Sequence, residues 1–235
     1  RKLERYSKAR AILATIPNES ASLGDADAWW VERRIVARHS VGIHKKDSVK
    51  AAYQIARNHG LDKGASAVEG EFLAGWIALR SLDDPEAALR HFTKLEEIAP
   101  SRTEKARAQY WLGRTYSALG NKAKSRAAYE AAAEHSTIYY GQLAREQVGL
   151  AKVPKDIKGG QPSAAAKESV ARDEVVRALD LMVKANAKSS LNMFVWSLAS
   201  RFDSVDEMNA VAALTKRHGG TTMALRLAKA AAQRN

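Results

Sequence analysis

Two stretches of the chain between Glu71 and Leu150 repeat one another, and their spacing constrains the fold more than any other feature. Phe92 and Tyr129 lie 37 residues apart, and Gly75 and Gly113 lie 38 apart. A period in this range is typical of helix-turn-helix repeats, in which a small residue lets two helices approach and an aromatic residue fills the next turn. The stretch therefore predicts two consecutive helical hairpins.

The second hairpin follows the tetratricopeptide pattern in part. Leu112-Gly113, Tyr116 and Tyr129 fall at the spacings of that pattern, whereas the tryptophan is displaced and no proline follows Ala132. Alanine is abundant and strand-forming runs of Val, Ile and Thr are absent. We therefore expect an all-α fold, a superhelical array of helix-turn-helix (tetratricopeptide-like) repeats.

Local signals place the joints between the helices. The first helix should end before Pro17, Gly60 should end another in a left-handed conformation, and Asp84-Pro85 should begin a helix as N-cap and first-turn proline. Further N-terminal signals are Asp25, Asp47, and the capping boxes Ser101–Glu104 and Ser204–Glu207.

The regular pattern ends after Leu150, where two prolines and two glycines lie between residues 154 and 163. We predict a repeat domain over residues 1–153, a linker over 154–166 and a small helical domain over 167–235. Four short helices should follow the linker, carrying Val175–Val183, Leu191–Leu198, Val211–Leu214 and Met223–Ala228.

Composition narrows the chemistry. The chain has no cysteine, which excludes disulfides and thiolate metal sites. Its histidines show no zinc-ligand spacing, so we expect them at helix ends or on the surface. Its glycines form no phosphate-binding loop. We therefore expect no metal and no cofactor. No apolar run approaches the ~20 residues that span a bilayer, so we expect no transmembrane segment.

The net charge of +12 is concentrated at the two ends of the chain. Residues 1–60 carry twelve Lys/Arg against six Asp/Glu, whereas residues 61–153 carry thirteen against twelve. Such ends would attract polyanions such as nucleic acid or peptidoglycan, although solvated helix faces explain them equally well. Arg33, Arg34 and Arg38 are the candidates for peptidoglycan carboxylates. Nucleic acid is disfavoured because aromatic and basic residues are not interleaved.

The aromatic residues allow two interpretations. Trp29, Trp30, Trp76, Trp111, Tyr139 and Tyr140 could form a lane on which sugars stack, but their helical spacing and apolar neighbours favour a core role. Tyr139 and Tyr140 open their helix, so one of the two can face solvent. We select them as candidate contact residues together with Gln142 and Arg114.

Four runs together resemble the helical superhelix of soluble lytic murein transglycosylases, with the closest likeness to those of alphaproteobacteria. They are Ala28–Arg34, Glu71–Arg80, Tyr110–Arg114 and Tyr139–Ala144. The segment from Asp173 to Ala231 resembles the linker helices of that family. The resemblance implies a periplasmic protein and a lysozyme-like catalytic domain farther along, with a Glu-Ser motif and a Gly-Leu-Met-Gln stretch. The chain opens without an initiator methionine or a signal peptide, so we expect it to be part of a longer protein.

Glu168-Ser169 reproduces the dipeptide of that catalytic motif. No Gly-Leu-Met-Gln follows, and a catalytic carboxylic acid requires an enclosed cleft that the edge of a polar linker does not provide. We therefore expect no catalytic residue here and no activity from this chain alone.

Two functions follow from the sequence. The first is the non-catalytic scaffold of a lytic transglycosylase, which would position or bind peptidoglycan. The second is a tetratricopeptide-like adapter that holds a protein or peptide partner in its concave face.

Overall fold

The computed structural model describes residues 5–150, 160–185, 197–202 and 204–234, and every regular element in them is a helix. The chain divides into two compact units, Arg1–Lys155 and Asp156–Asn235. Each unit has a separate hydrophobic core. The all-α prediction is confirmed.

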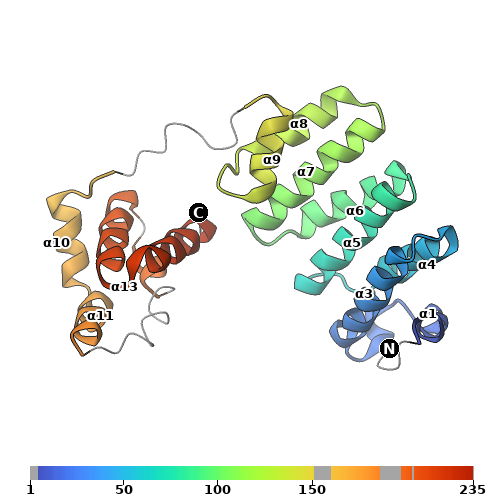
Figure 1. Cartoon of the computed structure of the whole chain (residues 1–235), viewed down its shortest axis with the longest axis horizontal. Helices are drawn as coiled ribbons and strands as arrows, with labels where there is room; N and C mark the ends of the chain where they lie inside the picture. Colours follow the sequence, from blue (N-terminus) through green and yellow to red (C-terminus); the bar gives the residue numbers. More distant parts are fainter. Residues whose placement is uncertain (1–4, 151–159, 186–196, 203, 235) are drawn as a thin grey trace. The chain divides into compact units, whose positions relative to one another are not determined.

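Unit 1 consists of helices joined by short turns (Figure 1). They are α1 (Tyr6–Thr15), α2 (Ser20–Leu23), α3 (Ala26–Gly42), α4 (Lys46–Arg57), α5 (Ala65–Ser81), α6 (Pro85–Ile98), α7 (Arg102–Ala118), α8 (Lys122–Ala133) and α9 (Tyr139–Gln147). Three hairpins, α3–α4, α5–α6 and α7–α8, follow one another, and α9 packs on the last of them. This succession is the predicted repeat array.

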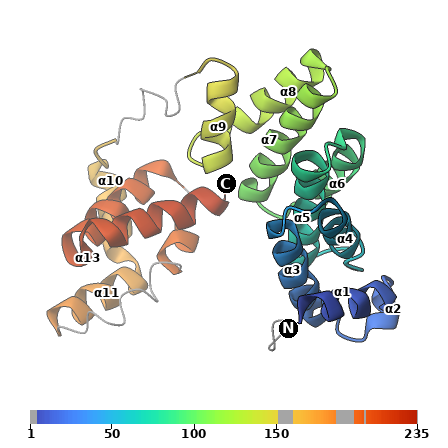
Figure 2. The ribbon, with the colours of Figure 1, turned by 45° about the vertical axis from the view of Figure 1, so that its right-hand side comes forward.

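Alternate helices of unit 1 form two layers. Helix α5 contacts α3 and α7, and α7 contacts α9, so these four helices build a continuous inner layer. Figure 2 shows them along one side of the unit, with α4, α6 and α8 along the other. We call α4, α6 and α8 the outer helices.

The predicted joints are largely confirmed. Asp84 accepts a hydrogen bond from the Ala87 amide as N-cap of α6, and Ser101 accepts one from the Thr103 amide at α7. Gly60 has the expected left-handed φ of 70°, but α4 ends at Arg57 with Asn58 as its C-cap, so the glycine follows the end of the helix and does not form it. The N-cap prediction for Asp47 was wrong. Helix α4 begins at Lys46 with Lys45 as its N-cap, so Asp47 lies in its first turn, where a negative charge still favours the helix dipole.

Glycines set the distance between the two helices of a hairpin. A Cβ atom at Gly75 of α5 would lie 2.8 Å from the Phe92 ring of α6, and one at Gly113 of α7 would lie 2.6 Å from the Tyr129 ring of α8. Both glycines and both rings are buried. The two contacts are equivalent, which explains the spacings of 37 and 38 residues in the sequence.

The core of unit 1 contains the aromatic residues that the sequence assigned to it. Trp30 and Trp111 are buried, and the Phe92 and Trp111 rings stack with centroids 5.7 Å apart. Trp29 and Trp76 are half-buried against the same core. Among the described helices, none is long and apolar enough to span a bilayer.

Unit 2 contains α10 (Ala164–Arg172), α11 (Glu174–Lys184) and α13 (Val205–Arg234), and residues 197–201 are also helical. Helix α10 begins inside the segment predicted as linker. Asp173 caps α11 by accepting from the Val175 and Val176 amides and pairs with Arg201 at 2.7 Å. Helix α13 is interrupted at Gly220, between the two helices predicted there. Residues 154–159 of the predicted linker and Leu191–Phe194 lie outside the described residues.

We predict that Gly75→Leu and Gly113→Leu each lower the free energy of unfolding by about 1–3 kcal/mol, because the added side chain overpacks an aromatic ring. Urea denaturation followed by circular dichroism measures this loss. Gly42→Leu is the matched control, because open space surrounds that position, and it should change stability by less than about 0.5 kcal/mol. Equal stability of all three variants would contradict the repeat alignment.

Candidate functional site

Arg33, the first candidate for peptidoglycan contact, is buried. Its side chain is 1% exposed, and Nη2 donates to the backbone carbonyl of Pro17 at 2.8 Å. Burial lowers the pKa of this guanidinium. Arg33 therefore ties α3 to the segment after α1 and is not accessible to a ligand at the surface, contrary to its selection from the sequence.

Arg34 and Arg38 lie one helical turn apart on α3, and both pair with Glu69 of α5. The Arg34 and Arg38 guanidiniums lie 2.7 Å and 3.0 Å from its two carboxylate oxygens, and the Trp30 indole donates to the same carboxylate at 3.1 Å. Arg38 remains 58% exposed. Glu69 thus offsets part of the positive charge, and Arg38 is the arginine of this set most available to an anion.

The other candidates come together around Tyr110 of α7. The Tyr110 ring lies 5.5 Å from that of Tyr140, and Arg114, one turn along α7, donates to the Tyr110 hydroxyl at 3.3 Å. Tyr139 packs against Tyr140 edge to face at 5.2 Å and is itself 66% exposed. We call Tyr110, Arg114, Tyr139 and Tyr140 the aromatic–arginine cluster.

This cluster is buried on one side and open on the other. Burial raises the pKa of Tyr129, which packs beneath Tyr110, to about 12, although the charge of Arg114 acts against this effect. The Tyr129 hydroxyl therefore stays protonated under physiological conditions. Gln142 is half-buried and lies three residues after Tyr139, on the same side of α9. The exposed edge of the cluster presents a phenol ring beside a cation and an amide.

Glu168 lies on α10 in unit 2 and is 66% exposed. It pairs with Arg172 one turn later, and its neighbour Ser169 donates to Glu207 at 2.7 Å. This pairing is typical of a solvated helix face. The environment of Glu168 therefore has the polar, open character that the sequence indicated.

A buried polar network in unit 1 includes two histidines, whereas the sequence predicts histidines at helix ends or on the surface. Glu71 of α5 contacts His59 at 3.3 Å through one carboxylate oxygen and His91 of α6 at 2.6 Å through the other. His91 in turn contacts the Tyr53 hydroxyl of α4 at 3.1 Å. The network thus links three consecutive helices.

The partners of each ring set the proton positions. The Leu61 amide donates to His59 Nδ1 at 3.1 Å, so His59 Nε2 carries the proton and donates to Glu71. His91 can donate to Glu71 through Nδ1 and accept from Tyr53 through Nε2. An ionised Glu71 then accepts a hydrogen bond from each ring, and every hydrogen bond of the network is satisfied.

The network favours the ionised form of Glu71. Burial alone would raise the pKa of this carboxyl, but the hydrogen bonds and charges of His59 and His91 outweigh it and lower the pKa to about 2. The residues described contain no cluster of three or more His, Asp or Glu side chains arranged to hold a metal ion. Through its hydrogen bonds the network joins the α3–α4 hairpin to the α5–α6 hairpin.

One signal in the sequence could have revealed these contacts. Tyr53 and His91 are 38 residues apart, and Trp30 and Glu69 are 39 apart. Each pair thus spans one repeat period, because residues at equivalent positions of successive hairpins lie side by side. Polar and aromatic residues one period apart are the pattern to search for.

The tetratricopeptide repeat family matches residues 106–134, which cover most of α7 and all of α8. The chain is a tetratricopeptide-like helical array. This match and the stacked hairpins make it a helical scaffold of the kind that binds a partner. Comparison with curated proteins gave no match. Comparison with solved structures gave none either.

We predict that Glu71→Gln destabilises unit 1 by on the order of 2–3 kcal/mol at pH 7, because the amide loses the negative charge and places its NH2 group against one of the two donating histidines. The folded-state pKa is depressed, so this contribution is present above the unfolded pKa of 4.5. It should be lost as the pH falls from 4.5 toward 2. Urea titrations of both proteins at several pH values measure the difference.

Glu97→Gln is the control, because Glu97 forms an exposed ion pair with Lys94. This substitution should lower the free energy of unfolding by less than about 1 kcal/mol at every pH tested. A difference between Glu71→Gln and the parent that does not depend on pH would show that Glu71 contributes through packing and not through its charge.

Proposed function

We propose that this chain is the non-catalytic helical scaffold of a periplasmic lytic transglycosylase and that it binds peptidoglycan. The observation that carries the proposal is the location of the resemblance. The runs Ala28–Arg34, Glu71–Arg80, Tyr110–Arg114 and Tyr139–Ala144 lie on α3, α5, α7 and α9. These are the helices of the inner layer, and no run comes from an outer helix.

The chemistry of the inner layer supports a glycan ligand. Tyr139 offers an exposed aromatic ring for stacking on a sugar, and Arg114 and Gln142 nearby provide hydrogen-bond donors for hydroxyl, acetamido or carboxylate groups. Arg38, on the same layer, adds an exposed positive charge. A ligand in contact with both regions would be long, as a glycan strand is.

A protein partner is the second candidate, and the tetratricopeptide match at residues 106–134 favours it. Stacked helical repeats offer extended surfaces on which peptides bind. On this alternative the aromatic–arginine cluster would accept a peptide side chain in place of a sugar ring. Binding to purified cell-wall sacculi separates the two candidates.

We predict that the chain sediments with purified sacculi and that Tyr139→Ala weakens this binding about 3- to 10-fold through the lost ring contact. The substitution removes an exposed side chain, so the fold should be unaffected. Ile12→Ala, which truncates another exposed apolar residue, is the matched control and should bind as the parent does. Failure of the parent chain to sediment at low salt would refute peptidoglycan binding.

The electrostatic part of the binding can be measured separately. The Debye screening length falls from ~8 Å at physiological ionic strength to ~3 Å at 1 M. The amount of chain that sediments with sacculi should therefore fall as salt rises. Charge reversal at Arg38 should reduce this salt dependence, whereas the effect of Tyr139→Ala should persist at high salt. Amidation of the peptide carboxylates of the wall should weaken binding of the parent chain to sacculi, as added salt does.

We further predict that the purified chain releases no 1,6-anhydro-muropeptides from peptidoglycan and that Glu168→Ala changes nothing in this assay. Glu168 is exposed and paired with Arg172, so it lacks the enclosed site that a general acid requires. Liquid chromatography with mass spectrometry of the soluble products is the measurement. Anhydro products formed by the chain itself would contradict the scaffold proposal.

A further inference from the structure

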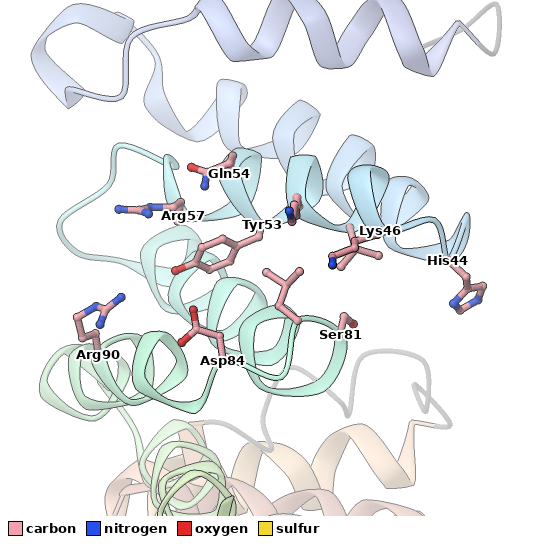
Figure 3. A pocket seen from close by; sticks show the side chains of 11 residues that line it. His44, Lys46, Tyr53, Gln54, Arg57, Ser81, Asp84 and Arg90 are labelled. Carbon is pink, nitrogen blue, oxygen red and sulfur yellow. The ribbon is translucent and has the colours of Figure 1, made fainter. Parts of the chain in front are cut away.

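A groove separates the outer helices α4 and α6 of unit 1. Both helices pack on α5 beneath them, and the hollow between them has a volume of about 700 Å³. Figure 3 shows its lining side chains, which come from α4, from the end of α5 and from α6. The groove thus lies between two successive hairpins, and its lining comes mainly from the outer helices α4 and α6.

The groove is strongly basic. Lys46, Lys50 and Arg57 of α4 and Arg90 of α6 line it, and the one carboxylate in the lining belongs to Asp84. Asp84 is already engaged as the N-cap of α6, where it accepts from the Ala87 amide at 2.9 Å. None of the four cations forms an ion pair with a carboxylate of the described residues. Their charge is therefore available to a ligand.

The cations are arranged in a line. Lys46, Lys50 and Arg57 occupy positions i, i+4 and i+11 of α4, which share one face of a helix. At 1.5 Å per residue the first two lie about 6 Å apart along the axis, and the first and last about 16 Å apart. A single small anion cannot contact all three. In an extended peptide, by contrast, side chains on one face recur every ~6.6–7 Å, which matches the first interval.

Apolar side chains also line the groove, and one of them is held in place. Val49, Tyr53 and Leu82 contribute to it, and the Tyr53 ring is fixed by the bond from its hydroxyl to His91. The Arg57 guanidinium lies 5.6 Å from the centre of that ring. In Figure 3, Arg57 and Arg90 lie at one end of the groove and Lys46 at the other. A ligand with anionic groups on one face and short apolar groups between them fits this lining.

We propose that the α4–α6 groove binds an extended acidic segment of a protein partner, with carboxylates at alternate positions facing Lys46, Lys50, Arg57 and Arg90. The charge complementarity and the linear spacing carry this assignment. This proposal goes beyond the proposed binding of peptidoglycan. The cations belong to α4 and α6 and not to the inner layer, so each proposal can be tested without the other. The protein would then hold a partner on its outer side while its inner layer contacts the wall.

Fluorescence anisotropy of a labelled peptide Gly-Glu-Leu-Glu-Leu-Glu-Gly with the full chain tests the proposal. The peptide should bind at low salt, and the analogue with glutamine in place of each glutamate should bind at least about tenfold more weakly. Lys46→Glu/Lys50→Glu should weaken binding of the glutamate peptide by about tenfold or more. Arg90→Glu, at the other end of the groove, should weaken it as well.

Lys105→Glu/Lys122→Glu is the matched control. It makes the same change in net charge at exposed positions near helix N-termini outside the groove, where a negative charge also suits the helix dipole. This variant should bind within about twofold of the parent. Circular dichroism of all variants checks that they remain folded, and the two groove variants alter different helices.

Three results would overturn the proposal: no binding of the glutamate peptide at low salt, equal binding of the glutamine analogue, or an equal loss in the control variant. Sedimentation with sacculi provides a further outcome. If the groove variants lose wall binding and the parent does not bind the peptide, the groove serves wall carboxylates and the assignment to a protein segment is wrong.

Discussion

The close approach of two helices at a glycine beneath an aromatic ring is the contact on which unit 1 depends. At Gly75 and Gly113 there is no room for even a Cβ atom against Phe92 and Tyr129. The aromatic ring supplies the area that must be buried, and the glycine supplies the distance at which it fits. Because the same pair recurs in successive hairpins, the hairpins have the same geometry and stack as a repeat.

Stacking equal hairpins also determines where polar groups meet. Residues one period apart come into contact, and two such sets, Trp30 with Glu69 and Tyr53 with His91, continue into ion pairs and hydrogen bonds. Each set surrounds a carboxylate of α5, which satisfies a group that would be costly to bury alone. These carboxylates belong to neighbouring positions, Glu69 and Glu71, and face different partners. Helix α5 is therefore the element that joins the hairpins on either side of it.

The two layers differ in chemistry, and this difference organises the functional proposals. The inner layer, which we propose to bind peptidoglycan, carries an exposed tyrosine and a partly neutralised arginine pair. The groove between the outer helices carries four cations that form no ion pair within the described part of the chain, three of them in a line along α4. A scaffold with unlike ligands on its two sides would connect them, because both surfaces belong to one array whose helices share a core.

The sequence by itself determined the helical class, the period and most of the helix joints, because these depend on local signals such as Asp84-Pro85, Gly60 and the aromatic–glycine spacing. It also indicated that Tyr139 or Tyr140 would face solvent.

Only the tertiary structure decided which charged side chains are buried, paired or exposed. Arg33 and Arg34 are adjacent and chemically identical, yet one is buried against a backbone carbonyl and the other pairs with Glu69, since neighbouring residues of a helix point about 100° apart. The histidines around Glu71 and the lysines of the α4–α6 groove follow the same rule. Glu71 lies 12 residues from His59 and 20 from His91, and Tyr53 lies 38 from His91. Only the fold brings these residues together, and net charge carries no information about such contacts.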